Sequence, residues 1–287
     1  MFKFSLFMKV LIIGSKGMLG QELAREFAEN GYEVTTWDKE EIDITKKEEV
    51  SKRISDLKPE IIVNAAAYNA VDKIEEGEKD FADQVNGYAV LNLSEAAEAV
   101  DAIFVHYGTD YIFDGKEIDG YKEDAMPNPQ SLYASSKLLG EQQIKNKKYY
   151  LIRTSRLFGK QAQSVGAKKS FVDVMLKCAE EKDCLELVDE EVSSPTYVCD
   201  LAHRTREIIE WKKPFGIYHV TNEGSCTWYG WAKKTFELSG KSVKLIPVGA
   251  DRFPRPAKRP KYSILINTKL PPIRKWEEAL ADYLKTK

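Results

Sequence analysis

Between residues 9 and 154 the chain alternates short β-branched segments with longer segments of helical periodicity. Strands that follow one another with a helix between them run parallel, and the helices then cover both faces of the sheet. The alternation therefore predicts a doubly wound parallel α/β sheet. The predicted strands are Lys9–Ile13, Glu33–Trp37, Ile61–Asn64, Ala102–Tyr107 and Tyr149–Thr154, and the predicted helices are Gln21–Asn30, Val50–Leu57, Phe81–Val100 and Leu132–Lys145.

A glycine-rich turn joins the first predicted strand to the first helix, with the pattern G-x-x-G-x-x-G over residues 14–20. Glycines in such a turn allow a sharp bend, close approach to a pyrophosphate and tight packing of helix on strand. The helix N-terminus offers free N–H groups and a positive dipole end to phosphates. In this strand–turn–helix context the motif favours a Rossmann-like dinucleotide site over a plain turn. The residues predicted to contact the cofactor here are Gly14, Lys16, Gly17, Met18, Leu19 and Gly20.

The choice between NADH and NADPH stays open. Asp38 follows the second predicted strand, about 20 residues beyond the turn, where a carboxylate accepts ribose hydroxyls and favours NADH. Lys16 and Lys39 point the other way, because an ammonium can pair with the 2′-phosphate of NADPH, although Lys39 equally fits a solvated surface lysine. Asp43 and Ile44 are candidates for the adenine site, and Asp43 could instead cap a turn.

A tyrosine and a lysine stand four residues apart on a predicted helix, at Tyr133 and Lys137. This spacing puts both side chains on one face, where the ammonium would lower the pKa of the phenol and could also hold the nicotinamide ribose. Thr109 ends the fourth predicted strand, where its hydroxyl could donate to a substrate carbonyl. Each feature alone also fits an aromatic contact or a turn hydroxyl. Together, and in this order, they predict a carbonyl-reducing site.

Beyond Thr154 the alternation loosens. We predict a helix at Phe171–Glu181, a strand at Gly216–Val220, a helix at Trp228–Leu238 and a Pro-rich basic segment at Arg252–Lys261. We interpret residues 8–154, with later elements from about 186–222, as a dinucleotide-binding domain. Residues 155–185 and 223–287 are interpreted as a smaller C-terminal substrate-binding domain. Trp228 and Trp231 are expected in the helix core rather than in a nucleotide stacking site.

Composition excludes several classes of protein. The 43 Lys+Arg against 45 Asp+Glu give a net charge of -2, which argues against a basic nucleic-acid-binding surface. The 4 cysteines form no CxxC pair and the 3 histidines lie far apart, so we expect no metal site and a reducing, cytoplasmic location. The apolar start of the chain lacks a cleavage site and runs directly into the glycine turn, and Met8 is an alternative start. No apolar stretch reaches the ~20 residues of a membrane span.

Several longer motifs resemble the extended short-chain dehydrogenase/reductase family and, within it, the dTDP-4-dehydrorhamnose reductases. The resemblance covers nearly the whole chain after Met8. Besides the glycine turn, the matching segments are residues 64–73, 108–115, 133–137 with Gly140 and Glu141, 153–155, 194–196, 228–229 and 253–260.

This resemblance implies that the chain reduces the C4 keto group of a dTDP-linked 6-deoxysugar with NADH or NADPH to give dTDP-L-rhamnose. Tyr133 would protonate the oxygen, Lys137 would orient the ribose, and Thr109 would hold the carbonyl. By the same resemblance, Ala65, Ala66 and Tyr68 would line the cofactor, and Val71, Asp110 and Tyr111 would lie near the sugar.

Some residues bear on the substrate. Sugar dehydratases usually carry Asp-Glu after the threonine, whereas Tyr111 follows Asp110 here, which favours a simple reductase. The family commonly has Ser and Trp where this chain has Gly108 and Arg156, so Arg156 could meet a charged group on another substrate or form a structural ion pair. In the basic segment, Arg255 and Arg259 could contact the nucleotide diphosphate or remain solvated.

Two other functions stay open from the sequence. The first is a regulatory subunit of the same fold, like the β subunit that associates with methionine adenosyltransferase. The second is an epimerase or reductase of another nucleotide sugar. We expect a nucleotide-sugar ligand, no nucleic acid, no membrane, no metal, and a monomer or homodimer.

Overall fold

The computed structural model describes residues 8–164 and 169–287, so the N-terminal segment ahead of Met8 lies outside the described residues. A six-stranded parallel sheet forms the centre, with strand order β2-β1-β3-β4-β5-β9. This confirms the predicted parallel α/β fold. The strands are β1 Lys9–Ile13, β2 Glu33–Trp37, β3 Ile61–Asn64, β4 Ile103–Thr109, β5 Tyr149–Thr154, β6 Leu157–Phe158, β7 Cys184–Val188, β8 Thr196–Tyr197, β9 Gly216–His219 and β10 Lys244–Val248.

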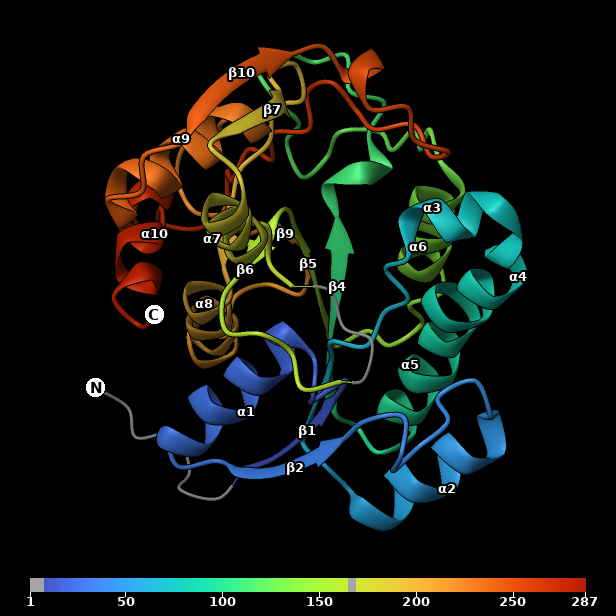
Figure 1. Ribbon diagram of the computed structural model, residues 1–287. Helices are drawn as coiled ribbons and strands as arrows, with labels where there is room; N and C mark the ends of the chain where they lie inside the picture. Colours follow the sequence, from blue (N-terminus) through green and yellow to red (C-terminus); the bar gives the residue numbers. More distant parts are fainter. Residues whose placement is uncertain (1–7, 165–168) are drawn as a thin grey trace.

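Helices cover both faces of the sheet (Figure 1). Apolar side chains of α1 and α8 pack on one face, and those of α2 and α5 pack on the other. The middle strands are therefore apolar on both sides, as expected for a buried parallel sheet. The helices are α1 Met18–Glu29, α2 Lys47–Leu57, α3 Val71–Lys73, α4 Lys79–Ala82, α5 Ala89–Ala99, α6 Leu132–Gln142, α7 Phe171–Glu181, α8 Val198–Glu210, α9 Trp228–Ser239 and α10 Trp276–Leu284, with π-helical turns η1 Ile74–Glu78 and η2 Asp83–Tyr88 and 3₁₀ turns η3 Asp110–Ile112 and η4 Ala250–Arg252.

The segment predicted as one helix over Phe81–Val100 contains the wide turn η2 between α4 and α5. A Cβ on Gly140 of α6 would clash with the Asn86 oxygen, so α6 approaches η2 very closely. The Asn86 side chain also donates to the Ser136 hydroxyl of α6 at 3.0 Å. Helical periodicity predicts the helix, but the wide turn follows from this tertiary contact.

The C-terminal part of the chain forms a separate layer at the upper left of Figure 1. There β7 and β10 make a two-stranded parallel sheet, while β6 pairs with β8. Trp231, Trp276 and Tyr283 form an aromatic core with α7, α9 and α10 around them. The elements of this layer follow Thr154 in the sequence. Two other elements that follow Thr154, α8 and β9, belong to the main sheet instead.

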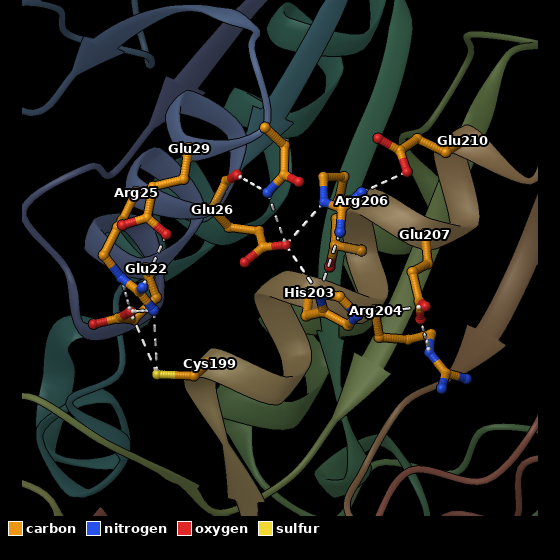
Figure 2. A network of polar contacts seen from close by, with 12 residues as sticks. Glu22, Arg25, Glu26, Glu29, Cys199, His203, Arg204, Arg206, Glu207 and Glu210 are labelled. Atoms are coloured by element: carbon orange, nitrogen blue, oxygen red, sulfur yellow. Dashed lines mark hydrogen bonds and ion pairs between the residues drawn. The ribbon is translucent and has the colours of Figure 1, made fainter. Parts of the chain in front are cut away.

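A polar network joins α1 to α8 (Figure 2). Glu26 accepts a hydrogen bond from Arg206 Nε at 2.8 Å and lies 3.0 Å from His203 Nδ1. Glu22 pairs with Arg25 at 2.7 Å. The Glu26 contacts cross from α1 to α8, as does the 3.4 Å contact of Cys199 Sγ with Glu22, whereas the Glu22–Arg25 pair lies within α1.

Candidate active site

The glycine turn lies at the switch point of the sheet, where β1 has β2 on one side and β3 on the other. Open α/β sheets bind ligands outside the carboxyl ends of the strands at such a point. Gly14 has φ +78°, and a Cβ there would lie 2.6 Å from the Ala66 nitrogen. A Cβ on Gly20 would clash with the Gly14 carbonyl oxygen. Both positions require glycine, and the turn exposes backbone rather than side chain at the start of α1.

Met18 and Leu19, at the start of α1, pack toward the core beneath the turn, Leu19 being buried and Met18 partly so. Any contact of Leu19 with a ligand would therefore come from its backbone.

Asp38, at the end of β2, is tied to this turn. Its Oδ2 accepts a hydrogen bond from the backbone nitrogen of Lys16 at 2.8 Å, and its Oδ1 accepts one from the backbone nitrogen of Lys39 at 2.9 Å. Because each carboxylate oxygen can accept more than one hydrogen bond, Asp38 can still accept a ribose hydroxyl. The Lys39 side chain is exposed, and the Lys16 ammonium turns to Glu40, 2.8 Å away.

Asp43 and Ile44, the candidates for the adenine site, contact other parts of the protein. Asp43 accepts from the nitrogen (3.1 Å) and the hydroxyl (2.6 Å) of Thr45, and so caps a turn. Ile44 is buried in the core that α2 and α5 form with the sheet. The Ile44 side chain therefore packs toward the interior.

Ala65 and Ala66 follow β3 directly beside the glycine turn, where the Ala66 nitrogen donates to Asn64 Oδ1 at 3.1 Å. The Tyr68 hydroxyl donates to Glu78, and its ring meets Phe81 edge-on at 4.9 Å. These residues follow the carboxyl end of β3, next to the switch point.

Tyr133 and Thr109 meet above the end of β4. Ser131 caps α6 by accepting from the Ala134 nitrogen at 3.2 Å, and this places Tyr133 in the first turn. The Tyr133 hydroxyl donates to Asn69 Oδ1 at 3.3 Å and lies near the Thr109 hydroxyl, which itself donates to Asp110 Oδ1 at 3.2 Å. Burial raises the pKa of Tyr133 above its ordinary range, and the nearby Thr109 hydroxyl opposes this only in part. The lowered phenol pKa expected from the sequence is not found, because the neighbouring Asp110 and Tyr111 raise the phenol pKa further.

Lys137 lies one turn further along α6 and is only 3% exposed. Its ammonium donates to the Tyr107 carbonyl at 2.8 Å. Burial lowers the pKa of Lys137 to about 8, against the opposing effect of the Glu141 carboxylate. An ammonium has three donors, so this hydrogen bond leaves others for a ligand.

Asp110 is buried at the end of β4. Its Oδ2 accepts from the hydroxyls of Ser193 (2.9 Å) and Ser263 (2.5 Å). Burial raises the pKa of Asp110, and these hydrogen bonds lower it. The carboxylate thus joins two distant segments to the strand end, which is a structural role. The next residue, Tyr111, meets the Tyr133 ring edge-on at 6.0 Å.

Arg156 does not form the ion pair considered from the sequence. Its guanidinium donates to the carbonyls of Cys226 and Glu191, each at 2.7 Å, and lies 4.1 Å from the Trp228 ring centroid. Burial lowers the pKa of Arg156, opposed by nearby negative groups that include Asp110. Arg156 therefore clamps two loops and an indole together.

The arginines of the basic segment are paired with carboxylates. Arg255 binds Glu191, which also accepts from Trp228 Nε1 at 2.8 Å. Arg259 binds both oxygens of Asp72 at 2.7 and 2.8 Å. We call Tyr111, Arg156, Glu191, Arg255 and Arg259 the arginine wall, because the charges of Arg156, Arg259 and Glu191 all act on the Tyr111 phenol.

Val71, in α3, packs with the apolar group around Tyr133, next to the arginine wall.

The residues present fit a nicotinamide dinucleotide. The glycine turn offers backbone where side chains would clash, and Asp38 has acceptor capacity beside it. Thr154 ends β5 in register with Thr109, and among the described residues its buried hydroxyl has no hydrogen-bond partner. A buried hydroxyl without a partner costs free energy, which a ligand placed there would recover.

Three residues of the site were not predicted from the sequence. Asn69 accepts from Tyr133, Glu191 holds Arg255, and Trp228 contacts both Glu191 and Arg156. Asn69 lies inside the matching segment 64–73, whereas Glu191 lies outside the segments named from the sequence, and nothing in the pattern singles out either residue. Trp231 is buried and Trp228 packs against the same aromatic core, as expected for both, while the Trp228 indole also contacts Glu191 and Arg156.

In residues 8–164 and 169–287 no helix is both long and apolar enough to span a membrane. In the same part of the chain, no group of 3 or more His, Cys, Asp or Glu side chains is arranged to hold a metal ion.

The fold and the site together define the class of protein. A doubly wound parallel sheet, a glycine turn at its switch point, and a tyrosine and lysine one turn apart on α6 are the features of the extended short-chain dehydrogenase/reductases. The family model described as RmlD substrate binding domain matches residues 8–287, and the chain belongs to that family.

Individual relatives agree with this family. The spore coat polysaccharide biosynthesis protein SpsK of Bacillus subtilis (strain 168) is 36% identical over 96% of this chain and 97% of its own. A dTDP-4-dehydrorhamnose reductase structure from Clostridium acetobutylicum has a TM-score of 0.92 at 38% identity, covering 97% of this chain and 99% of its own. The Bacillus anthracis enzyme of that name, in complex with NADP, also has a TM-score of 0.92, at 35% identity and the same coverage.

Proposed function

We propose that this protein is an NADH- or NADPH-dependent reductase that converts dTDP-4-dehydrorhamnose to dTDP-L-rhamnose. The observation that carries the proposal is the meeting of the Tyr133 and Thr109 hydroxyls at the end of β4, with buried Lys137 one helical turn away. The names of the structural relatives support this substrate.

Tyr133 is the proton donor in this proposal. A bound nicotinamide supplies the hydride that reduces the sugar carbonyl. Because burial raises the pKa of Tyr133, the phenol keeps its proton at neutral pH and can give it to the new alkoxide. Thr109, whose hydroxyl donates to Asp110 Oδ1 at 3.2 Å, would turn this proton to the carbonyl oxygen as that oxygen gains negative charge.

Lys137 makes proton transfer from a buried phenol feasible. A phenolate in a buried site is costly unless a positive charge lies nearby. With a pKa of about 8, Lys137 is mostly protonated at neutral pH. It lies one turn from Tyr133 on the same helix face, and its remaining donors can hold ribose hydroxyls.

The arginine wall is proposed to bind the nucleotide diphosphate through Arg255 and Arg259, since guanidinium groups match phosphate oxygens. Both arginines are held in place by carboxylates, and each guanidinium has further N–H donors with which to meet a diphosphate. Tyr111, the member of the wall whose ring meets Tyr133, and Val71 are proposed to contact the sugar.

We propose residues 8–154 and about 186–222 as the dinucleotide-binding domain, with 155–185 and 223–287 as the substrate-binding domain. Within the first unit, α8 packs on α1 and β9 joins the main sheet, whereas β7 lies across the proposed boundary and pairs with β10 of the second unit. A cytoplasmic enzyme that binds no nucleic acid and acts as a monomer or homodimer is part of the same proposal, supported by the near-neutral net charge of -2.

The test uses the isolated protein with dTDP-4-dehydrorhamnose and a panel of other nucleotide-linked keto sugars, following loss of NADH or NADPH absorbance and the sugar product. Tyr133→Phe is expected to lower kcat about 100-fold or more while cofactor binding is kept. Tyr88→Phe, on the exposed side of η2, is the matched control and is expected to match wild type. If wild type turns over no sugar of the panel, the reductase proposal is wrong, and a binding-only role such as a regulatory subunit is favoured.

A further inference from the structure

Asn69 lies beside the Tyr133 hydroxyl, in the turn between β3 and α3. Its Oδ1 accepts from that hydroxyl at 3.3 Å, and within the described residues the Asn69 amide forms no other hydrogen bond. The Asn69 side chain is exposed, whereas Tyr133 is buried. A side-chain amide has two lone pairs on its oxygen and two N–H donors. Asn69 therefore keeps hydrogen-bonding capacity for a ligand that reaches Tyr133.

The turn that carries Asn69 is fixed on its N-terminal side by Asn86, which is 1% exposed. The Asn86 amide accepts from the Tyr68 nitrogen at 2.8 Å and donates to the Tyr68 carbonyl at 3.0 Å. It also donates to the Ser136 hydroxyl of α6 at 3.0 Å. One buried amide thus ties the residue before Asn69 to the helix that carries Tyr133.

The C-terminal side of the turn is fixed by backbone alone. Ala70 has φ -81° and ψ 63°, the values of an inverse γ-turn, and the Val71 nitrogen donates to the Asn69 carbonyl at 2.9 Å. Asn69 is therefore presented to Tyr133 by a turn of defined shape, so a ligand that binds at Tyr133 meets the amide in one place.

The other side chains packed with the Tyr133 ring are apolar or aromatic, among them Val71, Leu132 and Tyr111. In the proposed substrate the C4 carbonyl lies between C3, which bears a hydroxyl, and C5, which bears a methyl group. The methyl group fits an apolar surface, whereas a hydroxyl placed there would lose its hydrogen bonds to water without replacement. The hydroxyl-bearing side of the carbonyl is therefore expected to face Asn69.

Binding of the substrate also changes what Asn69 requires. When the Tyr133 hydroxyl turns to the sugar carbonyl, Asn69 Oδ1 loses the donor that it has in the ligand-free protein. The hydroxyl on the neighbouring carbon can donate in place of the phenol, and the amide N–H groups can donate to the same hydroxyl oxygen. One hydrogen bond is thus exchanged for another, and a sugar without that hydroxyl leaves the amide unpaired.

We propose that Asn69 is a specificity-determining residue that recognises the hydroxyl on the carbon next to the sugar carbonyl, which is C3 in dTDP-4-dehydrorhamnose. The inference rests on the proposed function, since it takes the keto group to lie at Tyr133. Because Asn69 is exposed in the ligand-free protein, water can replace a missing hydroxyl in part, and the discrimination is about tenfold.

The experiment measures kcat/KM for dTDP-4-dehydrorhamnose and for its 3-deoxy analogue, with the same reduced cofactor for both sugars. Wild type is expected to prefer the hydroxyl-bearing sugar about tenfold. Asn69→Ala is expected to lower kcat/KM for that sugar about tenfold and to change the 3-deoxy sugar less than about twofold, so that the preference disappears. Asn30→Ala, at the far end of α1 from the glycine turn, is the matched control and should keep the wild-type preference.

A second measurement covers a variant that is too slow for kinetics. Calorimetry with the product dTDP-L-rhamnose and its 3-deoxy counterpart gives the same ratio from dissociation constants. General damage to the turn would weaken both ligands alike, so only a change in the ratio supports a contact with the hydroxyl.

The outcomes separate this inference from the function on which it rests. If wild type uses both sugars equally well, or if Asn69→Ala lowers both by the same factor, the inference is overturned and the reductase proposal stands. If wild type reduces neither sugar, the proposed function itself fails.

Discussion

The glycine-turn rim, by which we mean residues 14–20 and 38–41, and the arginine wall lie in one protein but are built in different ways. In the rim, backbone groups of two short segments next to the first two strands do most of the bonding, as between Asp38 and the nitrogens of Lys16 and Lys39. In the wall, Arg156 reaches carbonyls 70 and 35 residues away, and Arg255 reaches a carboxylate 64 residues away. A site made from local backbone tolerates little change of shape, whereas a site made from distant side chains depends on the whole fold.

The first way to sharpen this comparison is Gly20→Ala in the rim. The new Cβ would clash with the Gly14 carbonyl, so the turn must shift, at a cost of about 1–3 kcal/mol. We expect NADH to bind roughly 100-fold more weakly, measured by calorimetry, with little change in the wall. Gly230→Ala on α9 is the control, because its Cβ would meet atoms only at 3.4 Å and beyond. Unchanged NADH affinity in Gly20→Ala would show that the rim does not hold the cofactor.

Glu191→Gln tests the wall. The amide can still accept from Trp228 but leaves Arg255 without its anionic partner. We expect the free energy of unfolding to fall by about 2 kcal/mol and the sugar KM to rise about tenfold, with NADH affinity unchanged. Urea unfolding and initial-rate kinetics measure both. Glu186→Gln, which breaks the more exposed pair with Arg252, should change neither by much. A loss of NADH affinity in Glu191→Gln would mean that wall and rim are not independent.

Lys137→Met tests a residue that belongs to neither the rim nor the wall, and it tests the lowered pKa of that residue. The pKa of Lys137 is lowered from 10.5 to about 8 by burial, so below pH 8 the folded state bears the cost of a buried charge. Between about pH 8 and 10.5 the unfolded chain binds a proton that the folded chain has lost, and the stability of wild type therefore rises relative to the variant. Urea unfolding across this range should show the variant's relative stability falling as pH rises. Parallel curves for the two proteins would refute the lowered pKa.

The smallest effect is expected outside both regions, in the network between α1 and α8 (Figure 2). Glu26→Gln weakens its contacts with Arg206 and His203. We expect a loss below about 1 kcal/mol in unfolding free energy, by urea titration, and unchanged NADH affinity and sugar KM. A change in NADH affinity or in sugar KM would show that the network between α1 and α8 affects the site.

Much of the fold and part of the site follow from local pattern. Alternating strand and helix segments predict the parallel sheet, because side-chain periodicity depends only on the geometry of each segment. The glycine turn can be recognised in the sequence because its glycines are needed to avoid backbone clashes within the turn and with the neighbouring loop. Tyr133 and Lys137 share a face because four residues make about one helical turn.

Features that depend on packing and on the exclusion of solvent were decided only by the tertiary structure. Burial raises the pKa of Tyr133, although the nearby lysine suggested the opposite. Arg156 clamps loops, and buried Asp110 joins strand end to distant serines, because chain segments far apart in sequence close over them. The wide turn near Asn86 likewise forms where α6 packs against it. The local sequence pattern does not determine which distant atoms pack against a residue, or how much water those atoms exclude.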